Sequence, residues 1–497
     1  MIGRLADLFR LAWGLLYWNS RKSWFQLRRG RIPCPCQSPS DSGRAFETAC
    51  DAALPWHNAG HFRRVCPLLV QTPHGFRCSV NAAEVRPFWG RAFAFYGGTL
   101  AAVYLAGALS IFGFLRFVGY PISIVHLVWP GSWHRVTEVR GWFFMERANR
   151  AFLAGRNAEG MLYLTNAHEF DPANYTIGFS LAQRLQYGQP ARADDIYREL
   201  IRLHPEQAAS TKQVWFRSLL ARGDFPAVEA LAASEVLADP ANAGVWMRAL
   251  LFATRQTGRL APLQTLLDSS APAALPWRRV LETELYLRAG RRDLALQQLH
   301  ERWPDARPYA LYYQISELTA NGDALTAVDL VGQHGGKLDN FATLSLLLEA
   351  YTALGATQSR ERLVASLLAP PLNPVTLRLL AAHLIRHPDP GLLDQVFARL
   401  DRDRLPLSDA TLEAYLAMAC AAGAARDWPK LSGVAHFIAA HGSGSTFTLS
   451  LLETFFHGET RHNRIASLLP ALPMGLEVHY ALLERYPGKP AAPAPNP

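Results

Sequence analysis

The sequence predicts a mostly α-helical protein: an α-solenoid of about ten helical hairpins, preceded by a transmembrane helix and a small cysteine-rich N-terminal domain. Three observations carry this prediction. Glycine or proline recurs at steps of 32 to 35 residues, 24 uncharged residues run from Ala92 to Leu115, and five of six cysteines lie between Cys34 and Cys78. A period near 34 residues is the signature of one helical hairpin per repeat. The recurring positions, called the register positions below, are Gly155, Gly188, Gly223, Gly258, Gly290, Gly322, Gly355, Pro388, Gly423 and Gly458.

Residues 1–20 and the basic residues after them are expected near a membrane surface. Residues 5–18 are apolar but carry Asp7 and Arg10, so they are too short and too charged to span a bilayer. An amphipathic helix on the inner leaflet is one interpretation, and a helix packed on the N-terminal domain is the other. Residues 1–91 hold 13 Lys and Arg against 5 Asp and Glu, whereas residues 137–497 hold 35 against 36. The near-neutral second region argues against a nucleic-acid groove.

Residues 21–87 are predicted to form a basic, cysteine-rich domain. A segment of this size with few long apolar runs buries little core, so a metal ion or disulfides would help it to fold. In the cytoplasm a structural Zn²⁺ site is favoured over disulfides. Disulfides and unlinked or redox-active thiols stay open, because the spacing shows one C-x-C and no pair of C-x2-C knuckles. The candidate zinc ligands are Cys34, Cys36, Cys50, Cys66 and Cys78.

Residues 88–118 are predicted to be a transmembrane helix. Their uncharged run reaches about 36 Å as a helix, enough for a hydrocarbon core of about 30 Å. Arg91 and Arg116 flank the run, and aromatic residues crowd both of its ends. The alternative is a buried core helix, but core helices are usually shorter and carry some charge.

Residues 119–137 are a membrane-proximal apolar segment, interrupted by Pro121 and Pro130. The uncharged residues 117–133 reach only about 25 Å as a straight helix, so a re-entrant or interfacial segment is favoured over a second crossing. The basic N-terminal region should face the cytoplasm by the positive-inside rule. A single crossing then places the helical hairpins on the opposite side, in the periplasm of a bacterium. Two crossings would return them to the cytoplasm.

Residues 138–486 are predicted to be the solenoid, and residues 487–497 a disordered, proline-rich tail. Glycine at a register position can end the first helix of a hairpin with positive φ at no steric cost. Asp224 and Asp323 follow two of these glycines, where a carboxylate caps the next helix. Proline follows the glycine by 17 residues in three successive repeats, at Pro172, Pro205 and Pro240, and stops the second helix there.

These repeats resemble the tetratricopeptide repeat family, whose unit is a helix–turn–helix of 34 residues. Within one repeat, Gly188, Ala193, Tyr197 and Pro205 fit the family's glycine, alanine, bulky and proline positions. The resemblance covers about residues 140–470. The small residue expected in each first helix is mostly lost, so the repeats are degenerate. Further matches are Ala295, Leu299, Ala327, Val331, Tyr286 and Tyr351, and the lost small residues are replaced by Leu181, Phe216, Leu251 and Leu348.

The resemblance implies that ligand contacts come from the concave face built by the first helices. We therefore expect an unidentified protein or peptide partner on that face. Any one exposed side chain there is more often solvated than functional. On the glycine register the candidate partner-binding residues are Trp142, Asn149, Arg248, Arg255, Glu284, Tyr309, Tyr312 and Glu413.

The sequence thus predicts a membrane-anchored scaffold that is not an enzyme, with no cofactor beyond the zinc ion. The sequence contains no phosphate-binding loop, dinucleotide fingerprint or H-E-x-x-H motif. Histidines near helix ends, among them His387, are expected to satisfy terminal carbonyls. Cys420 is expected to be an inert core thiol. The alternative function is an enzyme or assembly factor with metal or thiol chemistry in the cysteine-rich domain, whose repeats recruit the substrate.

Overall fold

The structure is a computed structural model that describes Trp13 and residues 69–73, 75–78, 97–303, 306–403, 405–441, 446–458 and 465–487. These residues are mostly α-helical, as the sequence predicts. The chain divides into two compact units, Met1–Arg147 and Ala148–Pro497. Cys34, Cys36, Cys50 and Cys66, the helix expected over residues 1–20 and nearly all of the expected tail lie outside the described residues, so the zinc site stays a prediction.

The first unit contains a short antiparallel hairpin of β1 (Leu69–Thr72) and β2 (Gly75–Cys78). Leu69 pairs with Cys78, which ends the second strand. Helix α4 (Gly98–Val118) follows, and it is the one helix among the described residues that is long and apolar enough to cross a membrane. Its last turn ends at Gly119, whose φ of 99° lies in the left-handed region.

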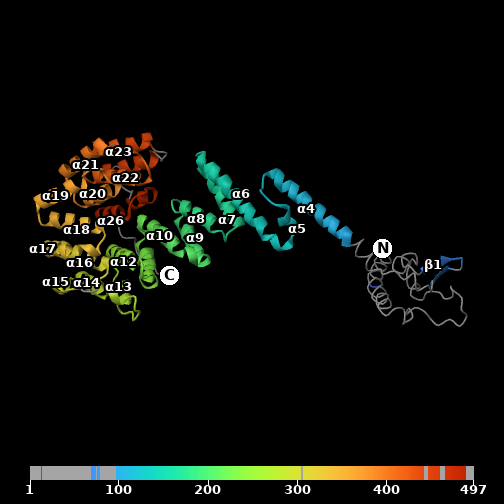
Figure 1. The fold of residues 1–497 in the computed structure, drawn as a ribbon, viewed down its shortest axis with the longest axis horizontal. Helices are drawn as coiled ribbons and strands as arrows, with labels where there is room; N and C mark the ends of the chain where they lie inside the picture. The colour runs from blue at the N-terminus through green and yellow to red at the C-terminus, as the bar shows by residue number, and fades with distance from the viewer. Residues whose placement is uncertain are drawn as a thin grey trace. The chain divides into compact units, whose positions relative to one another are not determined.

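After α4 the chain folds back along the same helix. Helix α5 (Ile124–Val128) has only five residues and is followed by the 3₁₀ helix η3 (Pro130–Ser132). The Tyr104 hydroxyl of α4 donates hydrogen bonds to the carbonyl oxygens of Leu127, at 3.2 Å, and Val128, at 2.8 Å. Figure 1 shows α5 beside α4. The proline-broken segment therefore returns beside α4 and contains no second helix of membrane-spanning length.

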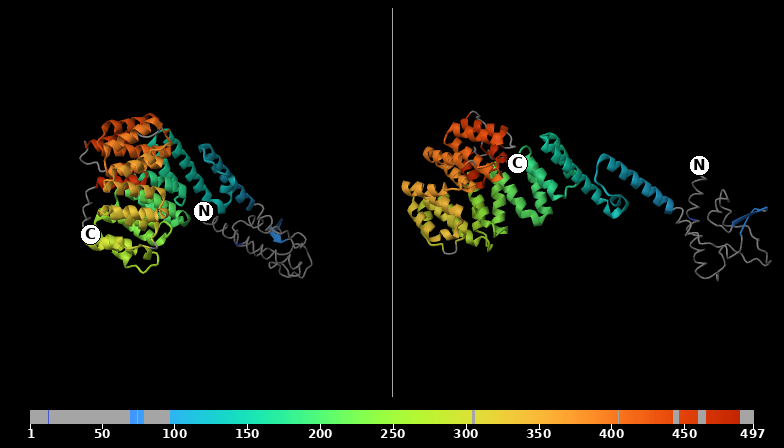
Figure 2. Two further views of the ribbon diagram at one scale, coloured as in Figure 1. Left: turned by 60° about the vertical axis from the view of Figure 1, so that its left-hand side comes forward. Right: turned by 45° about the horizontal axis from the view of Figure 1, so that its top comes forward.

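Helix α6 (His134–Leu153) spans the boundary between the units, and the second unit continues as paired helices in a curved stack (Figure 1). Neighbouring helices in the chain pack against each other, and Figure 2 shows the stack from two further sides. The helices are α7 (Asn157–Phe170), α8 (Tyr175–Leu185), α9 (Pro190–Leu203), α10 (Ala208–Ala221), α11 (Phe225–Ala238), α12 (Ala243–Thr257), α13 (Ala261–Leu267), α14 (Arg278–Arg288), α15 (Arg292–His300), α16 (Pro308–Ala320), α17 (Ala324–His334), α18 (Asn340–Ala353), α19 (Thr357–Leu367), α20 (Pro374–Arg386), α21 (Pro390–Asp403), α22 (Asp409–Ala424), α23 (Trp428–His441), α24 (Thr446–His457), α25 (Ile465–Leu468) and α26 (Leu476–Arg485). Short 3₁₀ helices join some of them: η4 (Pro205–Gln207), η5 (Leu275–Trp277), η6 (Gly335–Lys337) and η7 (Leu469–Ala471).

The register positions coincide with turns between helices in most cases. Gly155, Gly223, Gly258, Gly290, Gly322, Gly355 and Gly458 all have φ between 63° and 95°. Gly423 differs, because α22 continues through it to Ala424 and Arg426 takes the left-handed conformation with φ of 61°. Asp224 and Asp323 cap α11 and α17 by accepting from the amides of Ala227 and Thr326. The helix ends expected at Pro172, Pro205 and Pro240 are also confirmed, since α7, α9 and α11 all stop just before these prolines.

The last helix departs from the repeat pattern by turning back across the inner side of the stack. Helix α26 packs on α20 and contacts α10 (Figure 1). The Arg485 guanidinium donates to the carbonyl oxygens of Ile385, at 2.9 Å, and Ala424, at 3.2 Å, which are orphan acceptors at the ends of α20 and α22. The concave face expected to be open is therefore partly covered by the chain's own C-terminal helix.

The core of the second unit runs through the apolar faces of these helices. Trp277, Phe216, Leu219 and Met247 are among its fully buried side chains. Cys420 is completely buried there, and burial raises the pKa of its thiol to about 12. A thiol with that pKa stays protonated at neutral pH, which agrees with the inert core cysteine expected from the sequence.

Candidate functional site

Two adjoining cavities, together called the central cavity, lie between α26 and the inner helices of the stack. Their volumes are about 460 and 470 Å³, in the range of protein ligand sites. Helices α12, α16, α18, α20 and α26 contribute to both. The residues that line both cavities are Arg248, Tyr309, Tyr312, Ser345, Arg386 and Tyr480.

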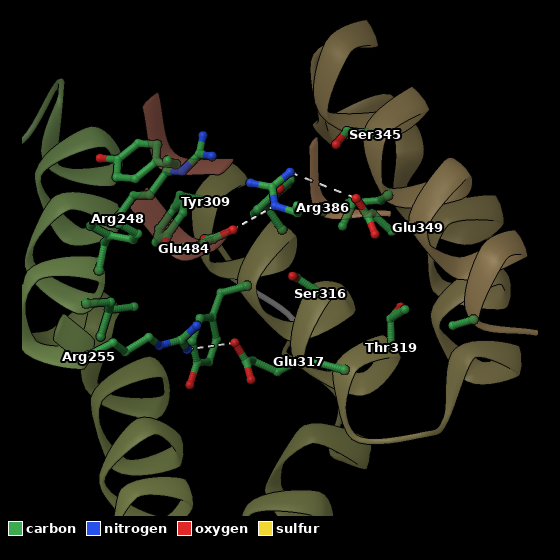
Figure 3. A pocket seen from close by; sticks show the side chains of 18 of the residues that line it. Arg248, Arg255, Tyr309, Ser316, Glu317, Thr319, Ser345, Glu349, Arg386 and Glu484 are labelled. Atoms are coloured by element: carbon green, nitrogen blue, oxygen red, sulfur yellow. Dashed lines mark hydrogen bonds and ion pairs between the residues drawn. The ribbon is translucent and has the colours of Figure 1, made fainter. Parts of the chain in front are cut away.

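Two of the four arginines that line the central cavity are neutralised by carboxylates. Arg255 donates from Nε to Glu284 Oε1 at 2.9 Å and from Nη2 to Glu317 Oε1 at 2.6 Å. Arg386 donates from Nε to Glu484 Oε2 at 2.7 Å, and its Nη1 lies 3.9 Å from Glu349 Oε1. Figure 3 shows Arg255 with Glu317, and Arg386 with Glu484 and Glu349, at the cavity. Each guanidinium is thus held between two carboxylates from other helices.

The other two are Arg307, which donates to the carbonyl oxygen of Pro240 at 2.9 Å, and Arg248. Arg248 has no hydrogen-bond acceptor among the described residues. The Arg248 guanidinium lies 4.5 Å from the ring centroid of Tyr480 and 5.7 Å from that of Tyr312, as a cation–π partner of both. Among the described residues no carboxylate lies within ion-pair distance of it. Tyr309 stacks on Tyr312 with ring centroids 6.1 Å apart. A half-buried cation surrounded by phenol rings, with no counter-charge of its own, is suited to bind an anionic group.

Burial raises the pKa values of several side chains that line the central cavity. Burial raises the pKa of Tyr480 to about 12 and raises the pKa of Tyr309 still further, so both phenols stay protonated and can donate hydrogen bonds. Burial likewise raises the pKa of Glu317, against the opposing effect of Arg255. No hydrogen bond of the Tyr309, Tyr312 or Tyr480 hydroxyl occurs among the described residues.

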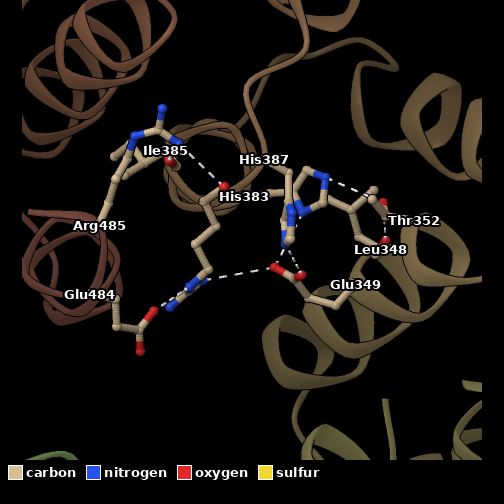
Figure 4. A network of polar contacts seen from close by, with 9 residues as sticks. Leu348, Glu349, Thr352, His383, Ile385, His387, Glu484 and Arg485 are labelled. Carbon is tan, nitrogen blue, oxygen red and sulfur yellow. Dashed lines mark hydrogen bonds and ion pairs between the residues drawn. The ribbon is translucent and has the colours of Figure 1, made fainter. Parts of the chain in front are cut away.

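A second polar cluster sits at the edge of the cavity between α18 and α20. Glu349 of α18 faces His383 and His387, which lie four residues apart at the end of α20 (Figure 4). The distances are 3.2 Å from Glu349 Oε1 to His383 Nδ1 and 2.7 Å from Glu349 Oε2 to His387 Nε2. Burial alone would raise the pKa of Glu349, but hydrogen bonds with the two histidines outweigh burial and hold this pKa well below its usual value.

The structure brings together five of the eight residues expected to contact a partner. Arg248, Arg255, Tyr309 and Tyr312 line the central cavity. Glu284 is buried at 1% exposure, where its carboxylate accepts from Arg255 and, at 2.9 Å, from the Tyr313 hydroxyl. Glu284 was expected on the open face, but these two bonds draw it beneath the cavity wall as a support for Arg255.

The other three expected residues are not among those that line the central cavity. Trp142, in the first unit, and Asn149 are exposed residues of α6, which contributes no lining residue. Glu413 of α22 is half-buried and forms an ion pair with Arg378 of α20. This pair accounts for the charge of Glu413 without a partner protein.

Sequence reasoning missed Arg386 of α20, and it missed Tyr480 and Glu484, which join the site only when α26 folds back. It also placed His387 as a cap of terminal carbonyls, whereas its ring faces Glu349. The signal that was present is the H-x3-H spacing of His383 and His387, which puts both rings on one helix face.

Comparisons with known proteins add no family to this description. No protein-family model matches the chain, and a search of curated proteins finds no significant match.

Proposed function

We propose that this chain is a membrane-anchored scaffold with a degenerate tetratricopeptide-type solenoid, and that the solenoid binds a segment of another protein in the central cavity. The observation that carries the proposal is that the charge of Arg248 has no carboxylate partner among the described residues. In a cavity where Arg255 and Arg386 each have two carboxylates, Arg248 has only aromatic rings around its charge. A carboxylate from a partner would supply the missing counter-charge.

The helical pairs support the repeat assignment. Ten consecutive pairs run from α6 and α7 to α24 and α25, with a turn at or near each register position. Positive φ at seven of the glycines is the conformation that ends a helix and reverses the chain. A stack of this kind places first helices on the inner side, where Arg248 of α12, Tyr309 and Tyr312 of α16 and Ser345 of α18 lie.

The surface of α4 supports the membrane anchor. Phe117 is 91% exposed and Leu100 is 74% exposed, and Ala108 is the one buried residue of this helix. An apolar helix with such a surface is stable in lipid and costly in water. The five-residue α5 is too short to cross, so we propose a single crossing with the basic N-terminal region in the cytoplasm and the solenoid on the other side.

The expected ligand is a short peptide segment with a carboxylate, either an acidic side chain or a free C-terminus. Arg248 would hold the carboxylate, while the hydroxyls of Tyr309 and Tyr480 add neutral donors. Apolar residues beside them, among them Val245 and Phe341, would receive neighbouring side chains of the peptide.

A binding experiment tests this proposal. Full-length protein in detergent micelles is used to select octapeptides from a random library, and the selected peptides are titrated against the wild type, Arg248→Met and Arg278→Met. A hydrogen-bonded charge contributes about 1.5–3 kcal/mol, so Arg248→Met should weaken binding about 10- to 150-fold. Arg278 is exposed and pairs with Glu282 on its own helix, so Arg278→Met should bind like the wild type.

Amidated peptides separate the two sources of the carboxylate. Loss of binding on amidation identifies a C-terminal carboxylate, and retention identifies an acidic side chain. Equal affinity of the wild type and Arg248→Met for every selected peptide would contradict the proposed site.

A further inference from the structure

The cluster at the edge of the central cavity has the composition of a metal-binding site. Glu349, His383 and His387 each offer one ligand atom, and these atoms all lie within 4.8 Å of one another. The three side chains come from two packed helices, α18 and α20, so the backbone holds their spacing. Figure 4 shows both imidazole rings directed at the same carboxylate.

We propose that Glu349, His383 and His387 bind a divalent transition-metal ion, with zinc as the preferred metal. Two histidines and one carboxylate form a three-ligand set with a fourth position open. Ligands about 2.0–2.1 Å from a tetrahedral zinc ion stand about 3.3 Å apart. The separation of 3.2 Å between Glu349 Oε1 and His383 Nδ1 already matches that spacing. The 2.7 Å contact of His387 needs only a small outward shift of a half-exposed ring.

The contacts of His383 allow its Nδ1 to act as a metal ligand while its Nε2 has a partner of its own. The Thr352 hydroxyl donates to the Leu348 carbonyl oxygen at 2.7 Å, which uses its only proton. The Thr352 oxygen therefore faces His383 Nε2, 3.5 Å away, as an acceptor. Which ring nitrogen of His383 carries a proton is set by the tautomer. In the tautomer with the proton on Nε2, the Nδ1 lone pair faces the Glu349 carboxylate, and a cation between the two would be bound by both.

The surrounding charges are compatible with a bound cation. Arg386 is the nearby positive group, with Nη1 3.9 Å from Glu349 Oε1, and it is neutralised by its 2.7 Å bond to Glu484. His383 is 3% exposed, whereas His387 is about half exposed, and Glu349, Thr352 and His387 line the central cavity. The fourth coordination position would therefore open to the cavity, where water or a carboxylate of a bound segment could occupy it.

Equilibrium dialysis with Zn²⁺ tests this site in the full-length protein in detergent. The cysteines of residues 21–87 are expected to bind zinc as well, so the quantity of interest is the difference between variants. The wild type should retain about one zinc ion more per chain than His387→Gln or Glu349→Gln. His436→Gln serves as the matched control, because His436 is exposed on α23 and its Nδ1 contacts a carbonyl of its own helix. It should retain as much zinc as the wild type.

Co²⁺ provides the second readout, which distinguishes these ligands from thiolates. A site of nitrogen and oxygen ligands should give visible ligand-field bands that disappear in His387→Gln, while thiolate charge-transfer bands in the near ultraviolet persist. Circular dichroism of each variant checks that its helices are intact. Equal zinc content of the wild type, His387→Gln and Glu349→Gln would overturn the proposal and leave the cluster as a hydrogen-bonded histidine–carboxylate group.

Discussion

Replacing Tyr480 by alanine should release α26 from the inner side of the stack. Tyr480 is 2% exposed and its ring meets Phe252 of α12 edge to face, with centroids 4.6 Å apart and an interplanar angle of 72°. The guanidinium of Arg248 lies over the same ring, 4.5 Å from its centroid. Alanine removes both contacts at once, so α26 loses its main attachment to α12.

The expected loss follows from the size of the buried ring. Truncating a buried aromatic residue to alanine costs about 3–5 kcal/mol, and the cation–π contact contributes about 0.5–2 kcal/mol where it is desolvated. The ring borders the central cavity, which water can fill, so we expect the total to be near the lower end, about 3 kcal/mol. Tyr480→Phe keeps the ring and should cost less than about 0.5 kcal/mol.

Backbone hydrogen exchange measures this loss locally, which suits a repeat array that need not unfold in one step. A loss of 3 kcal/mol should speed exchange of the α26 amides at least a hundredfold in Tyr480→Ala. The α14 and α15 amides, which lie on helices that contribute no residue to the central cavity, should be unchanged. Exchange of α26 within threefold of the wild-type rate in Tyr480→Ala would refute the reasoning.

Three further predictions concern the turns, the pH dependence and the membrane. Gly223→Ala should lower the free energy of urea unfolding by about 1–2 kcal/mol, because φ is 70° and the new Cβ would lie 3.3 Å from Ala466 Cβ. The control Gly188→Ala places a Cβ in open space at a residue without positive φ, so it should leave this free energy unchanged. Burial lowers the pKa of His479 below 6.5, despite opposing hydrogen bonds and Glu477, so the unfolded state binds the proton first as pH falls. The stability contributed by neutral His479 is thus complete above pH 6.5 and lost below it. Amide exchange of α26, corrected for intrinsic rates, should then be faster at pH 5 than at pH 7. This difference between the two pH values should be smaller in His479→Gln. A reporter active only outside the cytoplasm, fused after residue 140 or after residue 487, should be active at both points; activity of a cytoplasmic reporter instead would contradict the single crossing.

Local sequence signals predicted the helical pairs well, because each turn depends on residues close in the chain. The register glycines mark turns that need a left-handed residue, and seven of them adopt it. Gly423 was misassigned since glycine is also tolerated inside a helix, and the turn residue is Arg426. The return of α26 was not predicted, because it depends on contacts such as Arg386 with Glu484, which are 98 residues apart.

The candidate site was predictable only on the side that the repeats build. Arg248, Tyr309 and Tyr312 share the inner face because they hold related positions in their repeats, and the register placed them there. Which of these residues lack a partner could not be predicted, since that depends on pairing across helices. Arg255 and Glu413 found carboxylate and guanidinium partners 29 and 35 residues away, whereas Arg248 did not.

The central claim is that a partner segment binds inside the central cavity, and hydrogen exchange of full-length protein with and without a selected peptide tests it most directly. We expect the peptide to slow exchange in the cavity-lining helices α12, α16, α18 and α26. The helices α13, α15 and α17, which contribute no residue to the central cavity, should keep their rates. Protection confined to α13, α15 and α17 would contradict the claim.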